Sequence, residues 1–197
     1  MTDGSASGRT PSRAVEQALV DAAERVLVRD GLGGLTVRAV AAEAGVAPMG
    51  VYNRFGNKDG LVAAVLVRGF DGLATAVGED TDVDPTARLL ASGRNYRRFA
   101  LAHPQHYAAM FGPGLSQAAP TPELADRADA AFTALVDRVR YGMDRGVLRP
   151  GDPRGTAQLI WDAVHGAVSL ELGGLVLTPD AGASYEALLQ VLVDGLR

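Results

Sequence analysis

The chain has no cysteine among its 197 residues, which excludes disulfides and thiolate metal sites. It also lacks an apolar run of the roughly 18 residues that a membrane-spanning helix needs. Residues 1–7 contain no basic segment followed by an apolar stretch, so no secretory signal is expected. These absences predict a soluble cytoplasmic protein with no membrane partner.

A strongly basic balance, which marks many nucleic-acid-binding domains, is absent as well. The chain carries 19 basic and 23 acidic residues, a formal net charge of -4. Composition alone therefore does not point to DNA. With 47% hydrophobic and 21% charged residues, the chain is expected to be globular rather than disordered.

Alternation typical of strands bounded by hairpin turns is missing too, and apolar residues recur instead at helical spacing. Five prolines follow a residue that can cap a helix, at Thr10, Asp84, Thr121, Asp152 and Thr178. The pattern predicts an all-α protein of about nine helices. We expect them at residues 11–30, 37–44, 48–55, 58–77, 85–102, 104–111, 122–145, 153–172 and 180–196.

The spacing of these helices divides the chain. The early ones are closely spaced, with two short helices together, whereas most of the later ones are long. We therefore expect an amino-terminal domain over residues 1–57, with a flexible leader over 1–9. A helical bundle is expected over residues 58–197, and its first helix joins it to the amino-terminal domain. Residues 112–120, rich in glycine and proline, are expected to form a mobile loop.

A helix-turn-helix is predicted between Thr36 and Phe55. Thr36 can cap a short helix that Gly45 ends, and Pro48 begins a second helix three residues later. A short turn containing glycine between two short helices is typical of DNA-binding proteins whose second helix enters the major groove. Small alanines allow the two helices to cross closely.

The second helix would present its polar side to DNA, because Val51 and Phe55 share the inward face. Pro48, Met49 and Gly50 can meet bases only by shape or through a thymine methyl group. Lys58, the only lysine, lies in the first turn of the helix expected over residues 58–77, where a cation interacts unfavourably with the helix dipole. A DNA phosphate bound at that end of the helix would make the interaction favourable. The alternative is that Lys58 serves only solubility. The full set of DNA-binding candidates is Thr36, Arg38, Pro48, Met49, Gly50, Tyr52, Asn53, Arg54 and Lys58.

This segment resembles the tetracycline-repressor (TetR/AcrR) family. The matching residues are Thr36-Val37, Val40-Ala41, Ala44-Gly45-Val46, Val51-Tyr52, Phe55, Lys58 and Leu61. The resemblance implies a three-helix DNA-binding domain, a palindromic operator, dimerisation by the last two helices and release by a ligand. Ala47 departs from the family, which commonly has a capping serine there, so the start of the second helix is expected to be less anchored.

The second half resembles the subgroup whose carboxy-terminal domain is named for its Trp, His and Gly. The residues concerned are Tyr96 to Pro104 and Trp161 to Gly166. Aromatic residues and histidines there are candidates for an apolar effector pocket, although the same residues could simply fill the core. These ligand-binding candidates are Tyr96, Phe99, His103, Tyr107, Phe111, Trp161 and His165.

The effector is expected to be uncharged and largely apolar, with the reservation that Arg94, Arg97 or Arg98 turned inward would admit an acid. His165 could instead be a core histidine. His103 and His106 share a spacing of three, yet Pro104 lies between them and further ligands are missing, so no metal or cofactor is expected.

The sequence therefore predicts a ligand-responsive DNA-binding transcriptional regulator that acts as a repressor and a homodimer. The last helix would contribute Leu188, Leu189, Leu192 and Val193 to the contact with the second copy. The rival from another class is a helical ligand-binding or adaptor protein without DNA binding. No Ser/His/Asp arrangement or phosphate loop stands out, so catalysis is not expected.

Overall fold

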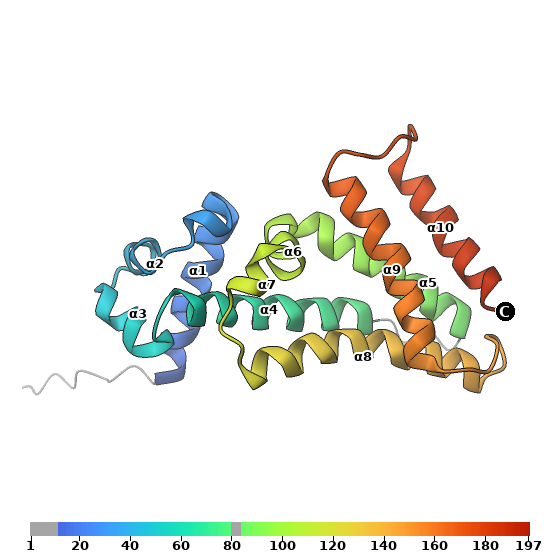
Figure 1. Ribbon diagram of the computed structural model, residues 1–197, viewed down its shortest axis with the longest axis horizontal. Coiled ribbons are helices and arrows are strands. Elements are labelled where there is room, and N and C mark those ends of the chain that lie inside the picture. The colour runs from blue at the N-terminus through green and yellow to red at the C-terminus, as the bar shows by residue number, and fades with distance from the viewer. Residues whose placement is uncertain (1–11, 80–83) are drawn as a thin grey trace, which may run out of the picture.

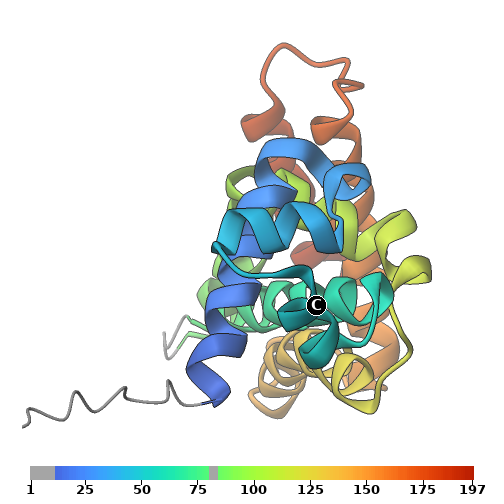
Figure 2. The same ribbon diagram turned by 90° about the vertical axis from the view of Figure 1, so that its left-hand side faces the viewer.

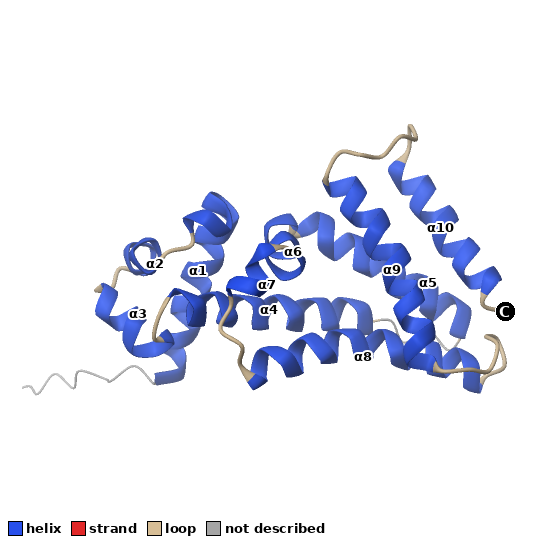
Figure 3. Cartoon of the chain, in the orientation of Figure 1, coloured by secondary structure: helices blue, strands red, loops and turns tan. Residues whose placement is uncertain are grey.

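The computed structural model describes residues 12–79 and 84–197, which form ten helices and no strand (Figures 1 and 3). The helices are α1 (Ser12–Gly34), α2 (Val37–Ala44), α3 (Pro48–Phe55), α4 (Lys58–Gly78), α5 (Pro85–Ala102), α6 (Pro104–Phe111), α7 (Pro113–Gln117), α8 (Pro122–Asp144), α9 (Pro153–Leu172) and α10 (Ala181–Gly195). The all-α prediction is confirmed.

Two predicted elements need correction. Residues 113–117, expected within a mobile loop, form the short helix α7, closed by a hydrogen bond from the N–H of Ala118 to the carbonyl of Gly114 (3.0 Å). The first helix runs to Gly34 rather than ending at residue 30. Gly31 interrupts it with a positive φ of 68°, so the predicted end corresponds to a kink.

The predicted caps hold at three of the four described positions. Asp84, Thr121 and Asp152 accept hydrogen bonds from N–H groups in the first turns of α5, α8 and α9. Thr178 is not a cap: Asp180 takes that place and accepts from Ala183 N at 2.9 Å. Thr10, with the predicted leader, lies outside the described residues.

The helices form two groups joined by α4 (Figure 1). Helices α1, α2 and α3 pack together at one end, and Figure 2 shows them in front of the rest of the molecule. Helix α4 begins against α3 and continues into the bundle, where it packs along α8. Helices α9 and α10 lie side by side at the opposite end.

Helix α4 corrects the expectation about membrane-spanning length. By length and composition alone, Lys58–Gly78 is long and apolar enough to cross a membrane. Half of this stretch is buried inside the protein, and its buried residues include Leu61, Val65, Leu66 and Phe70. A helix at the centre of a helical core has the same composition, because apolar residues on several of its faces have neighbours.

The outer surface of α9 and α10 differs from the prediction. Leu189 and Val193 are only 4% and 2% exposed, because they face the core of their own protomer. Leu188 and Leu192 are half-buried. The expectation that all four lie on an outer face is therefore wrong for Leu189 and Val193; the strongly exposed apolar residue of α10 is Val191, at 68%.

Candidate functional site

The turn between α2 and α3 is fixed by local interactions. Thr36 Oγ1 accepts a hydrogen bond from Ala39 N at 3.2 Å and so caps α2. Gly45 ends α2 with φ 68° and ψ 31°, a left-handed conformation that favours glycine. Pro48 stands in the first turn of α3, and Ala47 makes no side-chain cap there. The missing cap agrees with the expectation for Ala47.

Helix α3 is held by one face only. Val51 is fully buried and Phe55 half-buried, whereas Met49 is 64% and Tyr52 47% exposed. Gly50 and Asn53 are exposed as well. The outward side of α3 thus remains available for a partner.

The other DNA-binding candidates surround α3. Thr36 and Arg38 are exposed on the amino-terminal part of α2, and Arg54 and Lys58 are half-buried. Lys58 opens α4, whose cap is Asn57, with Oδ1 accepting from Gly60 N at 2.9 Å. The structure therefore places eight of the nine candidates on α2, its cap and α3, and the ninth, Lys58, at the start of α4.

Helix α2 is tied to α1 by a carboxylate between two guanidinium groups. Arg25 Nε donates to Glu43 Oε1 at 2.7 Å, and Arg29 Nη1 donates to Glu43 Oε2 at 2.8 Å. These two hydrogen bonds lower the pKa of Glu43 below its ordinary value. Glu43 thus links α2 to two positions of α1 at the surface of the domain.

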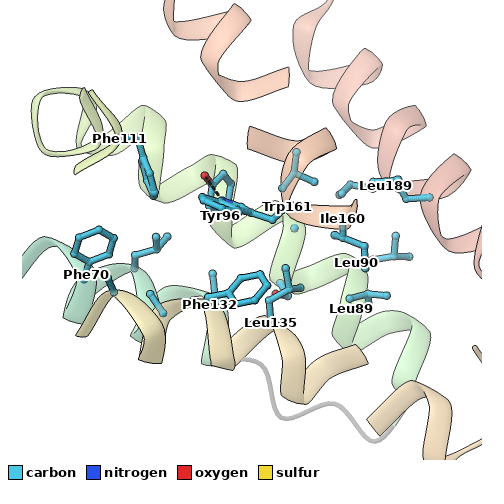
Figure 4. Close-up of a pocket in the computed structure, with 18 of the residues that line it drawn as sticks. Phe70, Leu89, Leu90, Tyr96, Phe111, Phe132, Leu135, Ile160, Trp161 and Leu189 are labelled. Atoms are coloured by element: carbon cyan, nitrogen blue, oxygen red, sulfur yellow. Dashed lines mark hydrogen bonds between the residues drawn. The ribbon is translucent and has the colours of Figure 1, made fainter. Parts of the chain in front are cut away.

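A cavity of about 200 Å³ lies in the bundle (Figure 4). Helices α4 to α10 all contribute to its wall, and no Lys, Arg, Asp, Glu or His is among the lining residues. The polar side chains in the wall are Ser92, Tyr96 and Trp161. Its apolar wall includes Phe70, Leu73, Leu89, Phe111, Phe132, Leu135, Ile160, Val164 and Leu189.

A small hydrogen-bonded cluster stands behind one part of this wall. Tyr96 Oη lies 2.9 Å from Nδ1 of His165 and 3.1 Å from Tyr107 Oη. Tyr107 Oη lies 2.7 Å from the same Nδ1, and Trp161 Nε1 donates to Tyr96 Oη at 3.3 Å. Burial raises the pKa of both tyrosines and lowers that of His165, so all three are neutral near pH 7.

The predicted ligand-binding residues are therefore divided by the structure. Tyr96, Phe111 and Trp161 line the cavity, and Tyr107 and His165 reach it through the hydroxyl of Tyr96. Phe99 and His103 are not lining residues: their rings lie 5.1 Å apart, and His103 is exposed. Sequence reasoning missed the contributions of α8 and α10, such as Phe132 and Leu189.

Two family models match the chain. One, described as "Tetracyclin repressor-like, C-terminal domain", covers residues 89–192, and the other, "Bacterial regulatory proteins, tetR family", covers residues 19–65. Together they span the helix-turn-helix and most of the bundle with the cavity. The chain belongs to the TetR family of DNA-binding transcriptional regulators.

Relatives of this TetR-family chain cover most of its length. The "HTH-type transcriptional repressor SCO4008" of Streptomyces coelicolor is 30% identical over 146 residues, 71% of this chain and 70% of the relative. The "HTH-type transcriptional regulator Rv1816" of Mycobacterium tuberculosis is 27% identical over 212 aligned positions, 91% of each chain.

Solved structures share the TetR-family fold. A protein of unknown function from Rhodococcus sp. RHA1 superimposes with a TM-score of 0.83 at 26% identity, over 98% of this chain and 99% of the other. The regulator FadR from Bacillus subtilis, in complex with stearoyl-CoA, gives a TM-score of 0.70 at 19% identity, over 92% of this chain and all of the other. The second likeness shows the fold alone.

Arg94, Arg97 and Arg98 would admit an acidic effector if they turned into the bundle of this TetR-family chain. All three lie beside carboxylates outside the cavity instead. Arg94 Nε donates to Glu186 Oε2 at 2.9 Å, and Arg97 Nε donates to Glu171 Oε2 at 2.7 Å. Arg98 lies 3.8 Å from a carboxylate oxygen of Glu79. None of the three lines the cavity.

His106, the second histidine of the pair with His103, connects the two helix groups of the TetR fold. His106 Nε2 on α6 lies 3.4 Å from Glu24 Oε1 on α1, and Arg68 Nη1 on α4 donates to Glu24 Oε2 at 2.8 Å. Burial alone raises the pKa of Glu24, but the hydrogen bonds with His106 and Arg68 outweigh burial and lower it. This cluster connects α1, α4 and α6.

Proposed function

We propose that the protein is a cytoplasmic homodimeric repressor that leaves a palindromic operator when an uncharged, largely apolar small molecule enters the bundle cavity. Residues 1–57 form the DNA-binding domain in this proposal, and residues 58–197 form the ligand-binding and dimerisation domain. The main support for this proposal is that one chain contains both an almost entirely apolar cavity and an exposed helix-turn-helix.

The size and chemistry of the cavity support the proposed effector class. A cavity of about 150 Å³ lined by apolar side chains is known to hold benzene, so 200 Å³ suits a one-ring molecule with a short substituent. A charged group would be buried without a partner, which is costly. Ser92, Tyr96 and Trp161 are the polar side chains of the wall, so the effector is expected to carry few polar atoms.

A path from the cavity to the DNA-binding domain supports ligand-controlled release. Phe111 and Leu115, on α6 and α7, line the cavity. Just beyond α7, Ala119 N donates to the carbonyl of Asp59 at 3.0 Å, in the first turn of α4. An effector that displaces α6 and α7 therefore moves the start of α4, and with it α3, and favours a dimer whose reading helices are wrongly spaced for adjacent major grooves.

Homodimerisation is supported by the outward faces of α9 and α10. Leu159, Ala163, Gly166 and Leu170 recur every three or four residues on α9, and none of them is buried. On α10, Leu188 and Val191 lie on the corresponding outward face. Two such faces brought together by a twofold axis form a four-helix contact with close approach at Gly166.

DNA contacts are assigned by position. Tyr52 and Lys58 are proposed to contact phosphates, as are Thr36, Arg38 and Arg54, while Pro48, Met49, Gly50 and Asn53 face the groove. Phosphate contacts set the register of the protein on DNA but carry no sequence information. The experiment is to select bound duplexes from genomic fragments and then measure their release by uncharged one-ring alcohols and by the corresponding carboxylates.

Release by an uncharged compound, accompanied by a change in Trp161 emission, would support the proposal. Failure to bind any duplex would favour the rival function, a helical ligand-binding or adaptor protein. Release by carboxylates alone would contradict the proposed effector class. We expect no catalytic turnover of any compound that binds.

A further inference from the structure

The outward side of α3 has a defined centre. Met49 and Asn53 each lie two residues from the fully buried Val51, which is roughly 200° around a helix. They are also four residues apart and so lie one above the other on one face. Tyr52 stands to one side of this face, near Pro48. Met49 and Asn53 thus point away from the domain core, and both are exposed.

Gly50, next to them, is not required by the fold. Its φ is not positive, and a Cβ built there would meet only Val46 Cγ2 at 3.9 Å, an ordinary van der Waals contact. A glycine inside a helix is less stable than alanine, because it loses more backbone freedom on folding. Packing within the protomer therefore gives no reason for the missing side chain.

We propose that α3 reads A·T base pairs: the Asn53 amide hydrogen-bonds an adenine, Met49 packs on a thymine methyl group, and Gly50 leaves room for the helix to approach the bases. This inference rests on the proposed function, since it concerns the operator of the same helix-turn-helix. It assigns the residues that determine sequence specificity and the base chemistry that they recognise.

The chemistry follows from what the major groove presents. An Asn side chain can bond both N6 and N7 of adenine, whereas reading of guanine typically uses Arg or Lys. No cation is at the centre of this face, which holds Met49 and Asn53, and Gly50 beside it carries no side chain. Met49 is apolar apart from a weakly accepting sulfur, and thymine alone offers a methyl group in the major groove.

The spacing of the two readers limits the operator sequence. Four residues of helix rise about 6 Å, close to two base-pair steps of about 3.4 Å each. The adenine and the thymine are therefore expected in neighbouring pairs or two steps apart in each half-site. Tyr52, at the side of the face, is directed to the groove wall instead.

The first experiment uses chemically altered DNA. Duplexes are selected from a randomised pool by the full-length protein, and each half-site adenine or thymine is then replaced singly by 7-deazaadenine or deoxyuridine. One 7-deazaadenine replacement should raise Kd by about 5-fold or more, because it removes one acceptor of a bidentate contact. One deoxyuridine replacement should raise Kd by about 4-fold, the effect of losing one buried methyl group. Unchanged Kd for every replacement would overturn the inference, with DNA binding itself intact.

The second experiment pairs protein variants with the same duplexes. Met49→Ala should weaken binding to the thymine duplex but not weaken it further on the deoxyuridine duplex, and Asn53→Ala should behave likewise toward 7-deazaadenine. Such non-additivity shows direct contact between the two changed groups. Additive losses in both cycles would overturn the assignment.

Gly50→Ala separates function from folding. The variant should raise Tm by about 2–4 °C, from the greater helix propensity of alanine, yet raise the operator Kd at least 10-fold. Gly33→Ala is the matched control, because Gly33 is an exposed helical glycine of α1 with nothing near its Cβ position; it should leave Kd unchanged. Undiminished affinity in Gly50→Ala would contradict the role of Gly50. If no duplex is enriched at all, the proposed function fails and this inference fails with it.

Discussion

The hydroxyl of Tyr107 and Nδ1 of His165 lie 2.7 Å apart, although the two residues are separated by 58 positions in the chain. Tyr96 Oη reaches the same nitrogen at 2.9 Å. A ring nitrogen either accepts one hydrogen bond or donates one, so the two hydroxyls compete for it. An effector that accepts a hydrogen bond from Tyr96 would resolve this competition, because His165 would then pair with Tyr107 alone.

His165 is expected to make stability depend on pH. Burial lowers its pKa, which the nearby Asp162 only partly opposes. The unfolded chain therefore binds the proton more readily, so the stability contributed by neutral His165 is fully present above about pH 6.5, its ordinary pKa, and is lost as pH falls. Tm measured from pH 7 to pH 5 should fall more for the wild type than for His165→Asn.

His103→Asn is the control for this pH prediction, because His103 is exposed. It should keep the wild-type pH dependence. The carboxyls of Glu24 and Glu43 have lowered pKa values and titrate below this window. Equal slopes for wild type and His165→Asn would show that His165 does not titrate differently in the folded protein.

The helix-turn-helix could be predicted from sequence because its signals are local. Thr36, Gly45 and Pro48 determine where α2 and α3 begin and end through contacts within a few residues. The cavity could not be derived in the same way, because its wall combines helices far apart in the chain. Phe132 and Leu189 carry no sign in the sequence that they face the same space as Trp161.

Phe99 and His103, which do not line the cavity, show the same limit. Phe99, His103 and Tyr107 recur at helical spacing, but His103, with φ -130° and ψ 55°, separates α5 from α6. The turn changes the direction of the chain, so Tyr107 is buried beside His165 while His103 stays exposed. Phe99 packs toward α4 instead, where its ring lies 3.2 Å from the position of a Cβ on Gly72.

Glu24→Gln should weaken the connection between α1, α4 and α6. The substitution keeps the shape of the side chain but removes the charge that His106 and Arg68 contact. Loss of charge-assisted hydrogen bonds at this half-exposed site should cost about 1 kcal/mol, or a Tm decrease of about 2–4 °C. Thermal unfolding measures this, with Asp126→Asn on the exposed side of α8 as the control.

The same variant is expected to respond less to effector, because the cluster joins the DNA-binding domain to α6 beside the cavity. DNA release at a fixed effector concentration should therefore fall in Glu24→Gln and stay normal in Asp126→Asn. A Glu24→Gln protein with wild-type Tm and wild-type release would rule out the cluster as a connection.

Charge placed on the outer face of α9 and α10 should dissociate the dimer. Leu159 and Val191 are 63% and 68% exposed in the protomer, and the dimer would bury both. Light scattering at micromolar concentration should give twice 20.5 kDa, about 41 kDa, for the wild type. The double variant Leu159→Glu/Val191→Glu should approach the protomer mass, whereas Leu101→Glu on α5 should remain dimeric. A wild-type protein of 20.5 kDa would refute the dimer.

The proposed phosphate contacts should weaken binding without changing specificity. Lys58→Ala and Tyr52→Phe are expected to raise Kd by similar factors on all duplexes, because phosphates are the same in every sequence. Lys58→Ala should also flatten the dependence of log Kd on log salt by about one unit per subunit, since one counterion fewer is released. Sequence-dependent losses in either variant would instead place that residue among the base readers.

Filling the cavity should block the effector without unfolding the protein. Ala131 on α8 lines the cavity and is 7% exposed, so a leucine there would extend into the empty volume. Ala131→Leu should keep operator binding and raise the effector Kd at least 10-fold, because the substituent occupies space that the ligand needs. Ala130→Leu, one position away on the exposed side of α8, is the matched control.

Trp161 reports this competition directly, because it is the only tryptophan in the chain and lines the cavity. Its emission should change when an effector binds to the wild type and to Ala130→Leu, and should not respond in Ala131→Leu. His165→Ala should also lower effector affinity, since it removes the partner that orients Tyr96. An effector that releases DNA with unchanged Trp161 emission, and that still acts on His165→Ala and Ala131→Leu, binds elsewhere in the protein.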